Sequence, residues 1–333
     1  MRTEDFDYDL PAELIAQEPI EPRDSARLLV DRGPGASPDH RHVRDLGRAP
    51  RTRRSARGQR FPRALPARLT LQRPTGGAAE VLLLESLDGR SLGGVGAARP
   101  KAPAGERLVL PDRTPLIEIG ERTAAGDTFV VHVLDHAAAD AHGAMPLPPY
   151  ITTPLQRPER YQTVYARERA RRRRRPRGCT SPRSSSNGSM PPGSSSRVEL
   201  MVGLDTFKPI STDDPADHVI HTERYRVPPE TMEACRTASR VVAVGTTAVR
   251  ALETAAATGQ LGGRSDLFIR RPYDWRIVDA MITNFHLPRT TLLCMIDAFV
   301  GPRWRALYES AIAERYRMLS FGDAMLLTRT EPR

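Results

Sequence analysis

The stretch that decides the fold is VVAVGTTAVRALET, residues 241–254. Its first four residues form a short apolar run that is typical of a buried strand, and the alanine-rich run after the glycine is typical of a helix. The strand-like segment 276–283 and the helical pattern of 304–316 continue this alternation toward the C-terminus. Alternating strands and helices predict an α/β domain with a mainly parallel sheet.

A different pattern fills residues 75–133, where short β-rich segments are separated by Gly, Pro and Asp. Segments of this kind predict a small β-barrel or sandwich. The proline-rich MPLPPYI at 145–151 ends that unit, because consecutive prolines exclude both a helix interior and a central strand. The sequence therefore predicts one α/β domain and one β domain, in keeping with the length of 333 residues.

Composition and motifs exclude several classes of protein. No apolar stretch approaches the roughly 20 residues that cross a bilayer, so we expect a soluble cytoplasmic protein. The cysteines Cys179, Cys235 and Cys294 are far apart and form no CxxC pair, which argues against a disulfide framework or a cysteine-rich zinc site. Without GxGxxG, P-loop or GxSxG patterns, dinucleotide, Walker and hydrolase functions have no support.

The turn at Gly245 is the first candidate site. Exposed amides at a helix N-terminus, beside the hydroxyls of Thr246 and Thr247, can bind a carboxylate, a ribose or a phosphate, and Arg250 follows in the same helix. The alternative is an ordinary helix cap in which a threonine satisfies the first turn. The sequence leaves both interpretations open.

A second candidate site follows the next predicted strand, in TNFHLPRTT at residues 283–291. Asn284 and His286 come directly after that strand, and Pro288 ends regular structure. In open α/β sheets the carboxyl ends of the strands hold the ligand. The alternative is a hydrogen-bonded loop histidine without a ligand.

Two further motifs carry ionisable groups. The spacing of His218, His221 and Glu223 in DHVIHTE is compatible with a metal, but nothing nearby completes a ligand set, so we expect no metal. Asp323 in FGDAMLL lies in a glycine turn, either as part of a solvated turn or as a contribution to a site.

Many motifs of this chain occur together, and in the same order, in one known family. They are LPAELIAQEPIEPRDSARLLV, TGGAAEVLLLE, MPLPPYI, YQTVYA, VGLDTFKPI, DHVIHTERY, VAVGTTAVRALE, TNFHLP and SFGDAMLL. On these motifs the chain resembles the S-adenosylmethionine:tRNA ribosyltransferase-isomerases of queuosine biosynthesis. The resemblance extends from near Met1 to near Leu327, with two interruptions.

The resemblance implies a fold and a reaction. The fold is an α/β main domain, residues 1–66 and 150–333, interrupted by an inserted small β-barrel at 67–149. The enzyme is a monomer without metal or cofactor. It moves the ribosyl part of S-adenosylmethionine, a substrate, onto 7-aminomethyl-7-deazaguanine at the tRNA wobble position, giving epoxyqueuosine, adenine and methionine.

The resemblance also selects site residues among the candidates above. A sulfonium acidifies the carbon next to it, so a positioned base can remove a proton there, and a proton donor helps adenine to leave. The ionisable groups in matching motifs are the catalytic candidates His221, Glu223 and His286. The candidates for holding substrate are Gly245, Thr246, Thr247, Arg250 and Asn284.

Two arginine-rich stretches, 46–64 and 167–201, depart from the family pattern. The first has RAPRTRRSARGQRFPRAL where the family has a strand similar to PGDLLVVNDTRV, and the second lacks AAPTAGLHFTPELL and TLHVG. Reading the last bases of each codon together with the first bases of the next codon allows the family pattern in two places. One place is from Thr52 to Ala64, and the other begins near Arg172. Our hypothesis is two compensated frameshifts that leave both stretches poorly ordered and unable to form the strands or the helix required.

The frameshift hypothesis changes how the charge is interpreted. A formal charge of +10 usually indicates a nucleic-acid partner, but the arginines of the two stretches outnumber that excess. The charge is therefore no sign of tRNA binding. We expect the chain as written to be a damaged, locally misfolded and inactive family member, because losing a buried sheet strand and a polar loop should cost more than the about 5–15 kcal/mol that stabilises a domain. A non-catalytic tRNA-binding protein is the alternative.

Overall fold

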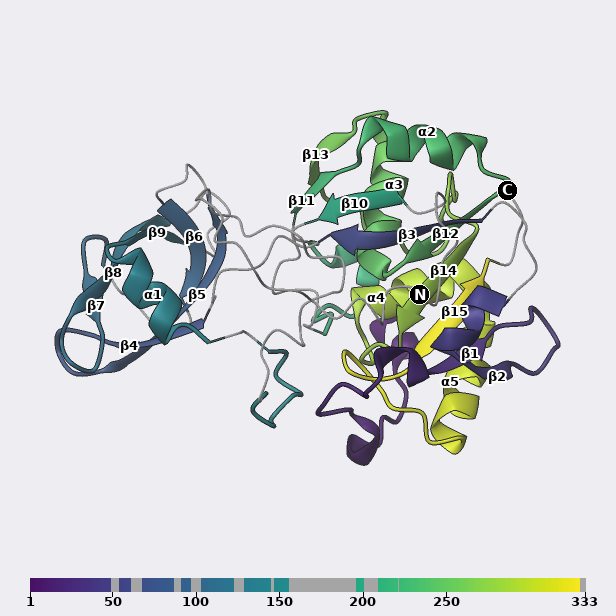
Figure 1. Ribbon diagram of the computed structural model, residues 1–333, viewed down its shortest axis with the longest axis horizontal. Coiled ribbons are helices and arrows are strands. Elements are labelled where there is room, and N and C mark those ends of the chain that lie inside the picture. Colours follow the sequence, from purple (N-terminus) through teal and green to yellow (C-terminus); the bar gives the residue numbers. More distant parts are fainter. Residues whose placement is uncertain are drawn as a thin grey trace. The chain divides into compact units, whose positions relative to one another are not determined.

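The computed structural model divides the chain into two compact units (Figure 1). Unit 1 contains residues 1–61, 149–167 and 174–333, and unit 2 contains 62–148 and 168–173. The sequence predicts the main boundaries at 66/67 and 149/150, and the structure has them at 61/62 and 148/149. The residues that the structure describes are 1–48, 54–60, 68–86, 91–96, 103–122, 129–144, 147–155, 196–200, 209–220 and 222–329.

Unit 1 is built on a nine-stranded sheet with the order β13-β11-β10-β3-β12-β14-β15-β1-β2. In that order the strands are Gly262–Ser265, Glu223–Arg226, Ser196–Leu200, Arg54–Arg60, Arg240–Val244, Ala280–Asn284, Ala324–Thr328, Arg27–Val30 and Asp39–His42. The α/β class is confirmed. The expected mainly parallel sheet is found in part: β10, β3, β12 and β14 are parallel neighbours at its centre, and β15 and β1 form a further parallel pair. The sheet is mixed because β15 returns antiparallel to β14 and both margins carry antiparallel strands.

The helices of unit 1 complete its hydrophobic core. In the described residues they are α2 (Pro229–Thr237), α3 (Thr246–Thr258), α4 (Thr291–Val300) and α5 (Trp304–Ala313). Helix α3 lies against β10 and β12, and its Val249 and Leu252 are fully buried. Short 3-10 helices occupy Thr3–Phe6, Ala12–Leu14, Arg23–Ser25, Val43–Arg48, Pro215–Asp217 and Gly301–Arg303. The strand and helix that the sequence predicts at 241–254 are thus the centre of the core.

Unit 2 contains six antiparallel strands in the closed order β4-β5-β6-β9-β8-β7. The strands are β4 (Arg68–Gln72), β5 (Ala78–Ser86), β6 (Ser91–Gly96), β7 (Arg107–Val109), β8 (Pro115–Arg122) and β9 (Phe129–Val133), followed by α1 (His136–His142). The pair Gln72–Val109 joins β4 to β7. Alternate residues of β4 and β9 are buried, so that Leu69, Leu71 and Val131 share one small core.

The two arginine-rich stretches contribute strands to the large sheet, which corrects one expectation. Residues 54–60 form β3 between β10 and β12, and residues 196–200 form β10. The prediction that neither stretch can form a strand is therefore wrong for these residues. The physical reason is that strand pairing uses backbone N–H and C=O groups, which every residue except proline can offer to two neighbouring strands. Most of the remaining residues in both stretches lie outside the described part of the chain.

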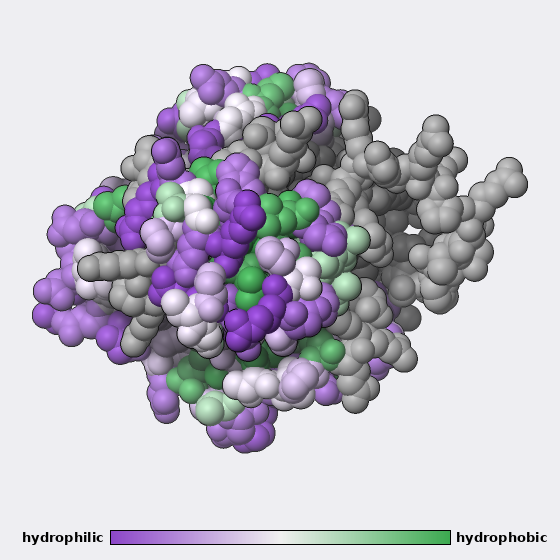
Figure 2. Space-filling view, turned by 90° about the vertical axis from the view of Figure 1, so that its left-hand side faces the viewer, coloured by the Kyte–Doolittle hydropathy of each residue, from purple (hydrophilic) through white to green (hydrophobic). Residues whose placement is uncertain are grey.

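The described surface is mostly polar. Figure 2 shows a face on which hydrophilic side chains predominate and hydrophobic ones form small separate groups. Among the described residues the exposed large hydrophobic side chains are Met1, Leu134 and Val219. No helix in the described part of the chain is long and apolar enough to cross a membrane. A polar surface of this kind favours partners that are recognised through charge and hydrogen bonds.

Candidate functional site

The candidate residues converge on one edge of the large sheet. Strands β12 and β14 are parallel neighbours, and they end at Val244 and Asn284. Strand β11 runs antiparallel to β10, with Tyr225 opposite Leu200, so β11 begins with Glu223 at this same edge. The carboxyl edge, as we call it, therefore carries Glu223, the turn at Gly245, and Asn284. Ligands of open α/β sheets bind at such an edge.

The N-terminus of α3 opens onto the carboxyl edge without a side-chain cap. Gly245 is the N-cap residue, with φ +90° and ψ 141°, and its N–H donates to the carbonyl of Ile282 on β14 (2.8 Å). The alternative in which a threonine hydroxyl caps the helix is wrong, because the cap position is held by a residue without a side chain. Thr246 and Thr247 are the first two helical residues, whose amides have no acceptor within the helix. These amides suit an anionic or hydroxyl-bearing ligand.

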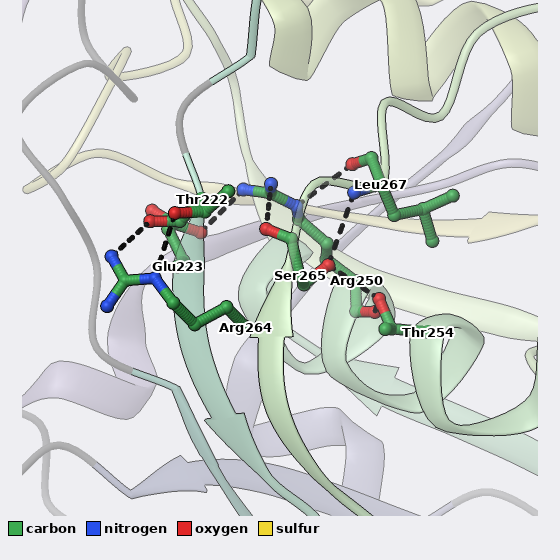
Figure 3. A network of polar contacts seen from close by, with 7 residues as sticks. All are labelled: Thr222, Glu223, Arg250, Thr254, Arg264, Ser265 and Leu267. Carbon is green, nitrogen blue, oxygen red and sulfur yellow. Dashed lines mark hydrogen bonds and ion pairs between the residues drawn. The ribbon is translucent and has the colours of Figure 1, made fainter. Parts of the chain in front are cut away.

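A buried ion pair joins two of the predicted residues. The guanidinium of Arg250 on α3 donates through Nη1 to Oε2 of Glu223 at 2.6 Å, and both side chains are at most one-tenth exposed (Figure 3). Arg250 also donates to the backbone carbonyls of Ser265 (3.0 Å) and Leu267 (2.9 Å). One side chain of α3 therefore fastens β11, β13 and the segment after β13. Burial lowers the pKa of Arg250, and the negative charges of Glu223 and Asp266 oppose that change.

His286 is a buried histidine with hydrogen bonds on its ring and on its backbone. Its Nε2 lies 3.0 Å from the hydroxyl of Thr283, and it is 9 % exposed. Its backbone N–H donates to the hydroxyl of Tyr308 (3.0 Å), and its carbonyl accepts from that of Tyr8 (2.6 Å). Burial lowers the pKa of His286 to about 4. The imidazole is therefore neutral near pH 7, and this geometry matches the hydrogen-bonded loop histidine that the sequence left as an alternative.

Asn284 and Asp323 hold the end of β14 against the start of β15. The side-chain amide of Asn284 donates to the carbonyls of Gly322 (3.3 Å) and Asp323 (3.0 Å). The carboxylate of Asp323 is 1 % exposed and accepts the backbone N–H groups of Arg27 and Arg317, each at 2.8 Å. The solvated-turn interpretation of Asp323 is wrong, because its carboxylate replaces water with two backbone donors.

The remaining sequence candidates are placed as follows. His221 lies outside the described residues and directly precedes Thr222. The ring of His218 packs edge-on against Phe268, with centroids 6.0 Å apart. Among the described residues no three His, Cys, Asp or Glu side chains gather as they do around a metal ion. Cys179 is outside the described residues, and Cys235 and Cys294 are buried cysteines that are not joined in a disulfide.

Three side chains that support the site were not singled out by their sequence pattern. Thr254 and Ser265 share a hydrogen bond of 2.7 Å next to Arg250 (Figure 3). Glu253 is fully buried on α3, and its carboxylate accepts the backbone N–H groups of Ile277 (3.1 Å) and Val278 (2.9 Å), which lead into β14. Burial raises the pKa of Glu253. An acidic residue among alanines in a buried helix was the available signal, because such a group must find donors.

Comparisons with known proteins agree on one family. A family model described as "Queuosine biosynthesis protein" matches residues 3–327. The S-adenosylmethionine:tRNA ribosyltransferase-isomerase of Symbiobacterium thermophilum is 43% identical over 98% of this chain and 100% of its own length. The enzyme of that name from Rubrobacter xylanophilus is 42% identical over 98% of both chains. The crystal structure of the S-adenosylmethionine tRNA ribosyltransferase from Thermotoga maritima is similar, with a TM-score of 0.50 and 31% identity over 97% of this chain and 99% of that one.

Proposed function

The chain belongs to the queuosine biosynthesis protein family, and we propose that the reaction of this family takes place at the carboxyl edge of the large sheet. The activity of this family is that of a transferase and isomerase that moves the ribosyl part of S-adenosylmethionine onto tRNA, as the names of the chain's nearly full-length relatives state. The observation that carries the location is the convergence of an uncapped helix N-terminus and a buried carboxylate–guanidinium pair on one sheet edge.

The acceptor in this proposal is 7-aminomethyl-7-deazaguanine at the wobble position of the tRNA. Its primary amine is a nucleophile, and an unpaired anticodon base can be presented at low cost. The product is epoxyqueuosine in tRNA, and adenine and methionine are released. S-adenosylmethionine is consumed as a substrate, so the proposal needs no cofactor or metal. The enzyme acts as a monomer in the cytoplasm, where its tRNA substrate is found.

The chemistry begins at the sulfonium. Its positive charge acidifies the carbon next to sulfur, so a base can remove a proton there. The bond between ribose and adenine breaks, and a proton donor neutralises the departing base. The tRNA amine then forms a bond to a sugar carbon, and a sugar oxygen displaces the sulfur from its carbon, which closes the epoxide and releases methionine with the electron pair of the broken carbon–sulfur bond. Holding both substrates in one geometry supplies much of the acceleration.

The residues of the carboxyl edge divide these tasks. The amides at the start of α3, in Thr246 and Thr247, hold the carboxylate or the ribose hydroxyls of S-adenosylmethionine. Asn284 and Arg250 shape the edge through their backbone contacts. Glu223 places a carboxylate beside the cationic substrate while it remains paired to Arg250. These five residues bind and orient the substrate.

The two candidate histidines differ in their capacity to transfer a proton. His286 is neutral near pH 7 because burial lowers its pKa to about 4, so it accepts or donates a hydrogen bond but holds no proton to give to adenine. His221 and Glu223 are the ionisable groups of the matching motifs that remain, and His221 is the first candidate for the base because the carboxylate of Glu223 is paired to Arg250. Glu223 is the alternative base.

The experiment that tests the function identifies the products. Two proteins are compared: the chain as written and a frame-restored chain, in which the two frameshifts are reversed. Each is incubated with S-adenosylmethionine and tRNA bearing 7-aminomethyl-7-deazaguanine. Release of adenine and methionine is expected from the frame-restored chain. Release of S-adenosylhomocysteine would instead identify a methyltransferase, and tRNA binding without any release would identify a non-catalytic binding protein.

A His221→Gln variant of the frame-restored chain tests the assignment of the base. We expect adenine release to fall by at least about 100-fold, the lower limit for a general base, with binding of S-adenosylmethionine kept. A His42→Gln variant is the matched control, since His42 is on the edge strand β2, at the opposite margin of the sheet from β11. Unchanged turnover in His221→Gln would transfer the role to Glu223.

The second candidate function is that of a damaged family member. Its specific support is the sequence of the two arginine-rich stretches, which lack the family's Asn-Asp-Thr-Arg strand and the Gly-Leu-His-Phe loop. Under this alternative the chain as written releases no adenine, whereas the frame-restored chain does. Turnover by the chain as written would exclude it.

A further inference from the structure

The edge of the large sheet next to the site carries two arginines in direct opposition. Arg224 on β11 and Arg264 on β13 are register partners in an antiparallel pair, and both are exposed. Directly opposite residues share one face of a sheet, with Cβ atoms about 4.5–5.5 Å apart. Like charges at this spacing destabilise the pair. The opposition of these two charges therefore gives the pairing of β11 and β13 no electrostatic gain.

The exposed face of the two arginines points away from α3. Successive residues of a strand point to opposite faces, and Glu223 and Tyr225 are buried whereas Arg224 is exposed. Glu223 binds Arg250 of α3, so the buried face is the one that α3 covers. The arginine pair, Arg224 and Arg264, therefore stands on the opposite, solvent-facing side of the strands that hold the site.

Arg264 connects this face to the carboxyl edge. Its guanidinium donates through Nε to the hydroxyl of Thr222 (2.9 Å) and through Nη2 to the carbonyl of Thr222 (3.3 Å) (Figure 3). Thr222 directly precedes Glu223, so these bonds draw the charge of Arg264 toward the site. Within the described residues no carboxylate forms an ion pair with Arg224.

Aromatic and apolar side chains continue the same edge. The segment before β11 and the segment after β13 meet where His218 packs edge-on against Phe268 (6.0 Å between centroids). Val219 is the most exposed of the large hydrophobic side chains in the described residues, at 81 %. Arginines that bind phosphates next to rings on which bases stack are the common means of binding single-stranded loops of RNA.

We propose that the exposed face of β11 and β13 is the docking surface for the tRNA, with Arg224 and Arg264 binding backbone phosphates of the anticodon loop. The His218–Phe268 pair offers an apolar surface to a neighbouring base. The negative charge of the anticodon loop attracts both guanidinium groups and offsets the repulsion between them. This inference rests on the proposed function, because it takes tRNA as the substrate.

The test measures binding of a fluorescently labelled tRNA transcript with guanine at the wobble position. Arg224→Gln in the full chain is compared with Arg236→Gln, an exposed arginine on α2 that removes the same charge. We expect Arg224→Gln to weaken binding about fivefold at low salt and to reduce the slope of log K against log salt by about 0.7–0.9, the contribution of one phosphate contact. Arg236→Gln should leave the affinity for tRNA and the salt slope unchanged within error. Arg224→Lys should keep most of the affinity. Equal losses in Arg224→Gln and Arg236→Gln would overturn the proposal, because the effect would then be one of net charge.

Measurements of thermal unfolding and of enzyme turnover distinguish a wrong docking surface from a wrong function. Arg224→Gln should unfold at the same temperature or slightly higher, since it removes a like-charge contact. In the frame-restored chain it should raise KM for tRNA about fivefold and leave kcat and the KM for S-adenosylmethionine unchanged. If adenine release persists with an unchanged KM for tRNA, the docking surface is wrong and the function stands. If the frame-restored parent neither binds tRNA nor releases adenine, both are wrong.

Discussion

Glu223 and Arg250 show how a residue's role depends on its partner. In the sequence they are a catalytic candidate and a substrate-holding candidate, and in the structure they bind each other at 2.6 Å. A buried guanidinium without its carboxylate would be an uncompensated charge, which is strongly destabilising. The pair therefore holds the geometry of the carboxyl edge, and a contact between the two side chains could not be read from residues 27 positions apart.

His286 gives a prediction at the residue scale. Its pKa is about 4 in the folded chain and about 6.5 when unfolded, so the unfolded state binds the proton more tightly. The stability that comes from the neutral ring is complete above about pH 6.5 and is lost as pH falls toward 4, by up to about 3 kcal/mol. His286→Gln should remove this part of the pH dependence in urea unfolding between those pH values.

The control for His286 is an exposed histidine. His132→Gln on β9 changes a side chain on the surface of unit 2 and should leave the slope of stability against pH as it is in the parent. A parent whose stability is flat from pH 6.5 to pH 4 would contradict the burial argument for His286. A slope that survives in His286→Gln would assign the proton uptake to other groups.

At the scale of elements, α3 is bounded by two glycines with different tasks. Gly245 has φ +90° and ψ 141° where the helix opens to the site, and Gly259 has φ +71° at the C-cap. Gly245→Ala should cost about 1–3 kcal/mol, because a side chain strains that conformation, and should raise the KM for S-adenosylmethionine by displacing the first amides. Gly259→Ala is the matched control, with a cost of about 1–2 kcal/mol from its left-handed conformation and an unchanged KM. Steady-state kinetics and urea unfolding of both variants in the frame-restored chain show whether KM rises because the start of α3 is displaced or because the whole fold is destabilised. An equal rise of KM in both variants would mean that the start of α3 holds no substrate.

The elements that the sequence predicts well are those whose pattern is local. The apolar run at 241–244 and the alanine-rich helix after it are found as β12 and α3, because burial and spacing are properties of adjacent residues. The strand β3, Arg54–Arg60, has no such pattern, and only its pairing with β10 and β12 makes it a strand. The antiparallel return of β15 was missed for the same reason, since strand direction depends on long-range connection.

The candidate site was predictable in position but not in roles. Polar residues after predicted strands lead to the carboxyl edge, because parallel strands end together. Whether a side chain is free to act depends on neighbours that are remote in sequence. The carboxylate of Asp323, for example, accepts the backbone N–H of Arg27. The backbone N–H of His286 donates to the hydroxyl of Tyr308. The same dependence hid the opposition of Arg224 and Arg264, which are 40 residues apart and become partners only through the register of β11 and β13.

At the scale of the whole molecule, the decisive prediction concerns the reading frame. The sheet retains a strand at 54–60, with the sequence RSARGQR, between β10 and β12. Central strands between parallel neighbours are normally rich in Val, Ile and Leu, because both faces are covered. Restoring the frame from Thr52 to Ala64 replaces this strand with one similar to PGDLLVVNDTRV, and each fully buried apolar side chain gained contributes about 1.5–3 kcal/mol. The frame-restored chain should therefore unfold at a higher temperature and release adenine, whereas the chain as written should unfold earlier and release none. Calorimetry and product analysis of the two chains side by side measure this difference, and equal stability with equal turnover would show that the arginine-rich strand is a working part of the fold.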